Sequence, residues 1–310
     1  MMWIREDSCY NYVLRTPMRM RLAVSGVIGI VAGALTWLFL RRLGIGGGDF
    51  NWAYDAARSL FAGQDPYAGT PPGTIPYPLP AVLYALPFAW MTREIAAATF
   101  FGFSSALLAF GLTKESYRRL LVFFCFPYWA AMITAQWTPL LTASACFPLL
   151  VPLTMAKPHI GLPVALTNLS RRGVLLSLGV IAISIAVMPS WPHRWISQLG
   201  GYQHFFPVLV FPGVFILLAG LRYCERDARL LLIASLVPQR WFYDPLILFL
   251  IPKTRRELIF TLGISWIVGV WRWFHNPHSM AQVGLWSVLG FYLPMLAVVL
   301  FRRDRTSADS

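Results

Sequence analysis

The chain has 310 residues, of which 57% are hydrophobic and only 13% are charged, and its mean hydropathy is +0.58. A soluble globular domain carries about twice that share of charge, so the composition excludes an ordinary soluble protein and indicates a polytopic membrane protein. The formal charge of +13 would suit nucleic-acid binding, but the basic residues stand in small clusters between apolar runs, as they do in cytoplasmic loops. We therefore expect membrane lipids, and no nucleic acid, as partners.

Each crossing takes roughly 20 apolar residues, so the chain has room for about ten transmembrane helices with short loops. We predict an all-α fold with one transmembrane domain, residues 22–301, between a cytoplasmic N-terminal segment, 1–21, and a cytoplasmic tail, 302–310. The four cysteines lie far apart, which indicates neither a disulfide framework nor a zinc site.

The first apolar run, Leu22–Leu40, is longer than a signal-peptide core and lacks a small-residue cleavage site, so we predict a signal anchor that stays in place. The arginines before it put the N-terminus in the cytoplasm. Residues 41–78 then form the first outer loop, although Arg41 and Arg42 in that loop run against the positive-inside rule.

A short amphipathic helix is expected inside the outer loop. Apolar side chains recur with helical spacing at Phe50, Ala53, Tyr54, Ala57 and Phe61. This helix, which Gly63 should stop, is too short to span the membrane, so we expect it to lie flat at the outer interface. The prolines between residues 66 and 80 then predict an extended loop.

Further apolar runs follow in chain order: Leu79–Met91, Ile95–Leu112, Leu120–Ala135, Pro139–Met155, Leu162–Leu169, Val174–Met188, Phe206–Leu221, Leu258–Val270 and Gly284–Leu300. The basic cluster at residues 114–119 follows two of these runs, so either the Leu79 helix is re-entrant or that cluster faces outward. Leu230–Val237 and Pro245–Ile251 are each too short to cross, which predicts two half-helices that meet at residues 238–244. From Arg171 onward every basic cluster falls on the inner side, which predicts a cytoplasmic C-terminus.

Asp49 is the strongest candidate for chemistry, because acidic side chains in or beside a membrane are costly. It follows three glycines and precedes the amphipathic helix, so its carboxylate could reach a hydroxyl at the headgroup boundary and act as a general base. The alternative is that Asp49 only caps the N-terminus of that helix.

Three more charged residues stand where the apolar runs are interrupted. Lys157 is either a lysine that snorkels to the interface or a cation that neutralises a lipid phosphate. Arg240 and Asp244 lie between the two half-helices, and irregular backbone at membrane depth needs cover from protein or a cavity. The alternative for this pair is a salt bridge of each side chain with the other.

Several short motifs occur in one order along the chain. They are Gly48-Asp49-Phe50, Gly63-Gln64-Asp65-Pro66-Tyr67, Tyr77-Pro78-Leu79-Pro80, Ala135-Gln136, Lys157-Pro158 and the segment Pro238–Trp241. With this set, over residues 46–252, the sequence resembles glycosyltransferase family 87, membrane enzymes of the GT-C class. The chain is shorter than typical members, and Phe242, Tyr243 and Asp244 stand where the family often carries a histidine.

The resemblance implies a GT-C-like fold. It also implies transfer of a sugar, mannose or another hexose or pentose, from a polyprenyl-phosphate donor to a glycan or glycolipid hydroxyl on the extracytoplasmic face. By analogy Asp49 is the base of an inverting reaction, and Lys157 and Arg240 bind the donor phosphate; no cofactor and no metal is expected. The expected substrate-binding residues are Asn51, Tyr67, Tyr77, Gln136, Tyr243 and Asp244.

Two other functions stay open. A transporter or lipid flippase would also use broken helices and buried charge, although the sequence shows no internal repeat of the kind that such proteins carry. A catalytically silent relative of the family is the third possibility.

Overall fold

The computed structural model describes residues 17–70, 74–275 and 279–302. In these parts of the chain the elements are helical, without a β-strand, and one isolated antiparallel bridge joins Phe205 to Gln239. The prediction of an all-α fold is therefore confirmed. The N-terminal segment 1–21 lies mostly outside the described residues, and the tail 302–310 lies almost wholly outside them.

The α-helices are α1 (Met18–Leu43), α2 (Asn51–Phe61), α3 (Leu79–Ala85), α4 (Arg93–Leu112), α5 (Phe126–Ile133), α6 (Thr138–Ser144), α7 (Pro158–Thr167), α8 (Arg171–Val187), α9 (Trp191–Ser197), α10 (Arg226–Leu236), α11 (Arg255–Phe274), α12 (Met280–Ser287) and α13 (Leu293–Phe301). The 3-10 helices are η1 (Gly48–Phe50), η2 (Leu86–Phe88), η3 (Tyr117–Phe124), η4 (Pro148–Ala156), η5 (Leu199–Gly201), η6 (Pro207–Leu209), η7 (Gly213–Arg222) and η8 (Asp244–Leu250). The π-helical stretch η9 (Val288–Tyr292) joins α12 to α13.

Among the described residues, four helices are long and apolar enough to cross a membrane: α1, α4, α11 and the continuous helix Met280–Phe301. A fifth crossing results if α8 is counted together with Trp191–Gly201, which follows it after a 90° bend. A multi-pass membrane protein is thus supported, but the prediction of about ten transmembrane helices is wrong.

The long helices run between two chemically different ends of the molecule. Arg21, in the first turn of α1, donates to the carbonyl oxygen of Phe110 near the end of α4 at 2.7 Å, so α1 and α4 are antiparallel. We call this end, which also holds Arg119, Arg226 and Arg302, the basic end. The opposite end, where α1 stops and α4 starts, is called the aspartate end because Asp49 follows α1 there.

Three helical hairpins start and finish at the basic end. The first consists of η3 and α5 followed by α6, the second of η4 followed by α7, and the third of α10 followed by η8. Arg226 joins their bases, because it begins α10 and donates to the carbonyl oxygen of Ala145 after α6 (3.1 Å) and to the side chain of Asn168 after α7. Arg119 in η3 donates to the carbonyl oxygen of Leu250 at the end of η8 (3.0 Å). The turns of the three hairpins therefore lie away from the basic end.

Proline explains why these apolar runs turn back instead of crossing. Pro127, Pro139, Pro158 and Pro245 stand at the start of α5, α6, α7 and η8, where proline is tolerated, and each separates its helix from the run before it. Ten helical residues, the length of α7, reach roughly 15 Å, about half of the hydrocarbon thickness of a bilayer. The predicted pair of half-helices is confirmed as α10 and η8.

The run that begins at Leu79 does not form a long helix and turns back, which is compatible with the first of the two alternatives for the basic cluster at residues 114–119. It forms only α3 and η2, which lead to Arg93 at the start of α4. Arg93 pairs with Asp55 of α2 at 2.8 Å, so this run returns to the aspartate end. α4 then makes one crossing and brings Arg119 to the basic end.

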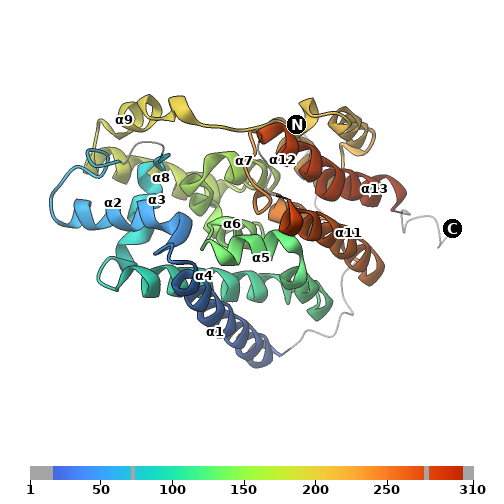
Figure 1. Cartoon of the computed structure of the whole chain (residues 1–310), viewed down its shortest axis with the longest axis horizontal. Helices are drawn as coiled ribbons and strands as arrows, with labels where there is room; N and C mark the ends of the chain where they lie inside the picture. The colour runs from blue at the N-terminus through green and yellow to red at the C-terminus, as the bar shows by residue number, and fades with distance from the viewer. Residues whose placement is uncertain (1–16, 71–73, 276–278, 303–310) are drawn as a thin grey trace.

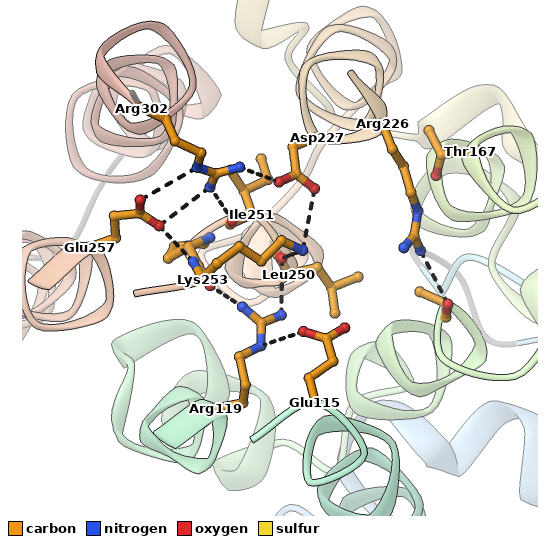
Figure 2. A network of polar contacts seen from close by, with 12 residues as sticks. Glu115, Arg119, Thr167, Arg226, Asp227, Leu250, Ile251, Lys253, Glu257 and Arg302 are labelled. Carbon is orange, nitrogen blue, oxygen red and sulfur yellow. Dashed lines mark hydrogen bonds and ion pairs between the residues drawn. The ribbon is translucent and has the colours of Figure 1, made fainter. Parts of the chain in front are cut away.

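A basic clamp closes the third hairpin at its base (Figure 2). Its members are Arg119, Asp227, Lys253, Glu257 and Arg302. Asp227, in the first turn of α10, accepts from Arg302 at 2.7 Å and pairs with Lys253 at 3.4 Å. The carbonyl oxygens of residues 250–252, which lack helical partners because η8 ends there, accept from the guanidinium groups of Arg119 and Arg302. The clamp therefore joins the two ends of the hairpin to α11 and α13.

Two features at the aspartate end complete the fold. The predicted amphipathic helix is confirmed as α2, with Ala53, Tyr54 and Ala57 buried, although Phe61 at its end is 85% exposed. Beyond α8 and α9 the chain runs as an extended segment along one edge of the molecule toward α12 (Figure 1). We call residues 198–206 the strap.

Candidate functional site

Asp49 is positioned by an approach of two backbones that only glycine permits. Gly48 has φ +60°, and a Cβ atom on it would lie 2.7 Å from the carbonyl carbon of Thr134, at the turn of the first hairpin. The backbone N–H of Asp49 donates to the carbonyl oxygen of Thr134 at 2.8 Å. The chain after α1 is thus fixed directly on the first hairpin turn.

The carboxylate of Asp49 points to side chains and does not cap a helix. The residue before α2 is Phe50, which makes no side-chain cap, so the N-cap interpretation of Asp49 is wrong. Its Oδ2 atom accepts a hydrogen bond from the hydroxyl of Tyr77 and lies 3.4 Å from the Nζ atom of Lys157. The Asp49 side chain is 27% exposed, whereas that of Asp244, the other acid nearby, is 0% exposed. Asp49 is therefore the acid of the site that a ligand can reach.

Lys157 stands at the turn of the second hairpin and joins the other turns to Asp49. Its ammonium group donates to the Oε1 atom of Gln136 in the first hairpin turn at 3.0 Å. It lies 3.9 Å from Oδ1 of Asp244 in the third hairpin and 4.9 Å from the ring centroid of Tyr243. A buried ammonium between two carboxylates does not snorkel to the interface, so that interpretation is wrong.

Asp244 is fully buried and fixes the backbone of the third turn. Its Oδ2 atom accepts from the backbone N–H of Arg240 at 2.7 Å and of Trp241 at 3.2 Å. The suggested salt bridge to the Arg240 side chain does not form. Among the described residues, Oδ1 of Asp244 has no hydrogen-bond partner, which is unusual for a buried carboxylate.

The two predicted phosphate ligands differ in how far they are already paired. Lys157 is engaged by two acids and an amide, whereas the guanidinium group of Arg240 forms no ion pair or hydrogen bond within the described parts of the chain. The Arg240 guanidinium lies 5.8 Å from the ring centroid of Tyr202 on the strap. Arg240 is therefore the cation that is free to meet an anion.

Aromatic rings form the wall around Asp49. Phe50 stacks on Phe100 at 4.4 Å between ring centroids, and Trp137 lies 4.7 Å from Phe100. Phe50, Phe100 and Trp137 are almost wholly buried, so these rings anchor the backbone beside Asp49 in the core. Tyr77 lies 6.0 Å from both Trp52 and Trp137, and it closes this wall above Asp49.

The environment of Tyr77 keeps its hydroxyl protonated. Burial, followed by the nearby carboxylate of Asp49, raises the pKa of Tyr77 well above its usual value of 10.0. The neutral Tyr77 hydroxyl keeps its proton and donates a hydrogen bond to the Asp49 carboxylate. Burial and the charge of Asp244 also raise the pKa of Tyr202 in the strap.

Two predicted substrate-binding residues hold the surrounding loops instead of lining the site. The Asn51 side chain accepts from the backbone N–H of Gly47 at 2.7 Å and donates to the carbonyl oxygen of Ile45 at 3.1 Å. Tyr67 is 2% exposed and donates to the carbonyl oxygen of Tyr77 at 3.0 Å. Both amino acids therefore shape the loops on either side of Asp49.

Two residues of the site were not among the predicted ones. His159, two residues after Lys157, brings its Nε2 atom within 4.0 Å of Oδ2 of Asp244 and 3.2 Å of the Tyr202 hydroxyl. The position of His159 beside the Lys157-Pro158 pair could have indicated it. Nothing local indicates Tyr202, because its contact with His159 joins residues 43 positions apart.

Taken together, the site places two acids, Asp49 and Asp244, against two cations, Lys157 and Arg240, with formal charges that cancel. The described residues contain no group of three or more His, Cys, Asp or Glu side chains that could hold a metal ion. One acid is accessible and one cation is unpaired, so the arrangement can accept a proton at one point and bind an anion at another.

Comparison with known proteins adds no relative: no protein-family model, no curated protein and no solved structure matches this chain.

Proposed function

We propose that the protein is a membrane glycosyltransferase that moves a sugar from a polyprenyl-phosphate donor to a glycan or glycolipid hydroxyl at the extracytoplasmic face. The observation that supports it is the environment of Asp49: a partly exposed carboxylate, oriented by Tyr77 and Lys157, beside a cluster of aromatic rings. The motif resemblance supplies the reaction class.

In the proposed reaction the acceptor hydroxyl gives its proton to Asp49 while its oxygen attacks the anomeric carbon. The bond from that carbon to the phosphate oxygen breaks, and the carrier phosphate leaves with the electron pair, so the sugar configuration is inverted. The Tyr77 and Lys157 contacts both fall on Oδ2 of Asp49, which leaves Oδ1 for the acceptor. Arg240 then stabilises the charge that develops on the leaving phosphate.

The test is transfer of a radiolabelled sugar from a polyprenyl-phosphate donor by the full chain in detergent or vesicles. Asp49→Asn keeps the side-chain size but cannot accept the proton, so transfer should fall about 100- to 10,000-fold. The matched control is Asp55→Asn, an exposed acid of α2 that pairs with Arg93, which should keep transfer within about twofold. Full transfer by Asp49→Asn would remove Asp49 as the base.

A transporter or flippase is the second candidate, and the burial of Asp244 favours it. Asp244 is 0% exposed and stands at a break between half-helices, as coupling acids of transporters do. In vesicles that contain a labelled polyprenyl-phosphate sugar, a transporter would move the lipid between leaflets without breaking the glycosidic bond. Movement without transfer, abolished by Asp244→Asn, would establish that function in place of the enzyme.

A further inference from the structure

The strap passes over the turn of the third hairpin and is bound to it through the backbone. Phe205 donates to the carbonyl oxygen of Gln239 at 2.9 Å, and Gln239 donates back to Phe205 at 2.8 Å. The Phe205 ring packs against Gly284 in α12, where an added Cβ would lie 3.0 Å from the ring. These two hydrogen bonds fix the backbone of Gln239, the residue immediately before Arg240.

Arg240 is held on its other side by Asp244, whose Oδ2 atom accepts from the Arg240 backbone N–H. The backbone of Arg240 is therefore fixed from both directions, while its guanidinium group has no acidic partner among the described residues. A cation that is fixed but unpaired, beside buried acids that already have a cation, is typical of a binding site for an anion.

Tyr202 is the strap residue that touches this guanidinium. Its ring centroid lies 5.8 Å from the Arg240 Cζ atom, within the range of a cation–π contact. The opposite end of the ring is also fixed, because the Tyr202 hydroxyl lies 3.2 Å from Nε2 of His159. At the start of the strap, Gln198 donates to the carbonyl oxygen of Tyr67 at 3.4 Å, which joins the strap to the loop beside Asp49.

We infer that Tyr202 is a positioning residue that holds the Arg240 guanidinium as the anion-binding group of the site, and that the anion is the phosphate of a lipid carrier. The inference rests on the proposed function for the identity of the anion. The strap thereby acts as the outer wall of the phosphate site.

The experiment measures binding of farnesyl phosphate, farnesol and inorganic phosphate to the full chain in detergent micelles. Wild type should bind farnesyl phosphate at least tenfold more tightly than farnesol or inorganic phosphate. Arg240→Gln should weaken farnesyl phosphate about tenfold or more and leave farnesol unchanged. Tyr202→Ala should weaken farnesyl phosphate about five- to tenfold, and Tyr202→Phe, which keeps the ring, should stay within about twofold.

The double variant Tyr202→Ala with Arg240→Gln decides whether Tyr202 acts through Arg240. If it does, the double variant binds no more weakly than Arg240→Gln alone, because the interaction is already lost. The control is Tyr223→Ala, whose side chain is 61% exposed at the basic end and which should bind as wild type does. Melting temperatures of all variants identify any that fail to fold.

Three results would overturn the inference: wild-type affinity in Tyr202→Ala, equal losses for farnesol and farnesyl phosphate, or a full additive loss in the double variant. Inorganic phosphate bound as tightly as farnesyl phosphate would remove the lipid carrier as the source. Because the readout is binding, the predicted pattern without sugar transfer would uphold the phosphate site and refute the glycosyltransferase.

Discussion

At the scale of single residues, Lys157 is the side chain on which the charge balance of the site depends. It lies 3.4 Å from the partly exposed Asp49 and 3.9 Å from Asp244, and both Lys157 and Asp244 are buried. Removing one partner of a buried ion pair lowers the free energy of unfolding far more than removing one partner of an exposed pair, because the charge that remains is buried without compensation. Lys157 therefore connects the stability of the three hairpin turns with the chemistry at Asp49.

Lys157→Met keeps the length of the side chain and removes its charge. We expect the free energy of unfolding to fall by about 3 kcal/mol, because Asp49 and Asp244 lose the ammonium group that lies between them. Sugar transfer should be lost as well. Denaturant unfolding followed by tryptophan fluorescence measures the first effect.

Lys114→Met, at an exposed position near the basic end, is the control and should unfold within about 0.5 kcal/mol of wild type. Adding Asp244→Asn to Lys157→Met should recover part of the lost stability, because one uncompensated charge is gone. If the double variant is less stable than Lys157→Met, charge balance is not what Lys157 provides.

The residues of the site could be predicted from the sequence where a local motif contains them or, for Asp244, where a break between two half-helices marks them. Asp49, Lys157 and Gln136 stand in such motifs, and the structure brings them together. Asn51 stands in one too, but its amide closes a local turn, which motif spacing cannot reveal. Tyr202 joins the site through a contact between distant elements, and no local pattern encodes that.

At the scale of elements, the close approach of η1 to the first hairpin turn sets the position of Asp49. Gly48→Ala introduces a Cβ at a position with positive φ and against the Thr134 backbone, so both the local conformation and the packing oppose it. We expect the free energy of unfolding to fall by about 3 kcal/mol and sugar transfer to be lost.

Gly44→Ala separates these two effects. Gly44 has φ +64°, close to that of Gly48, but no atom lies within 4 Å of its added Cβ. Gly44→Ala should lower the free energy of unfolding by only about 1 kcal/mol, the penalty of the left-handed conformation, and should leave sugar transfer unchanged. Equal losses in both variants, measured in the same unfolding assay, would show that the contact with Thr134 is unimportant.

The basic clamp makes a second prediction for the elements. Arg119→Gln removes the buried guanidinium group that donates to the carbonyl oxygens of Leu250 and Pro252 where η8 ends, and among the described residues only Leu250 keeps a second donor, Lys253. We therefore expect the free energy of unfolding to fall by about 3 kcal/mol. The neighbouring Arg118 is exposed, and Arg118→Gln should change the free energy of unfolding by less than about 0.5 kcal/mol. Similar unfolding curves for the two variants would contradict the role of the clamp.

Periodicity predicted α2 well because a three-turn amphipathic helix follows from local spacing alone. It could not predict that Phe61, at the end of α2, stays exposed, because that depends on what packs beyond Gly63. The arms of the first two hairpins were predicted as spans because hydropathy does not distinguish an apolar run that crosses from one that turns back at a proline.

At the scale of the whole molecule, the two ends should face opposite sides of the membrane. Cys224 is a free, exposed thiol next to the basic end, and Ser197 is exposed in α9 near the aspartate end. In a variant that lacks the other three cysteines, a membrane-impermeant maleimide should label Cys224 only from the cytoplasmic side. With Cys224 also replaced, Ser197→Cys should be labelled only from the outer side.

Labelling of both positions from the same side would refute the two-ended topology. Labelling of Ser197→Cys from the cytoplasm alone would invert it and would also place Asp49 on the cytoplasmic side.

The three hairpins also bear on how the protein is made. A translocon releases a segment into lipid once it is long and apolar enough. It would therefore insert the four long helices but not the shorter arms of the hairpins. Backbone groups at the first and third turns are hydrogen-bonded by other elements, Thr134 by Asp49 and Gln239 by Phe205. The arms can therefore enter the bilayer only into a space that the rest of the fold already surrounds. α11 and the helix Met280–Phe301 are synthesised last, so a ribosome-bound intermediate that stops before them should keep its third hairpin accessible to protease. Completion of the C-terminal pair would then be the step at which the third hairpin, with Asp244, takes its place beside Lys157.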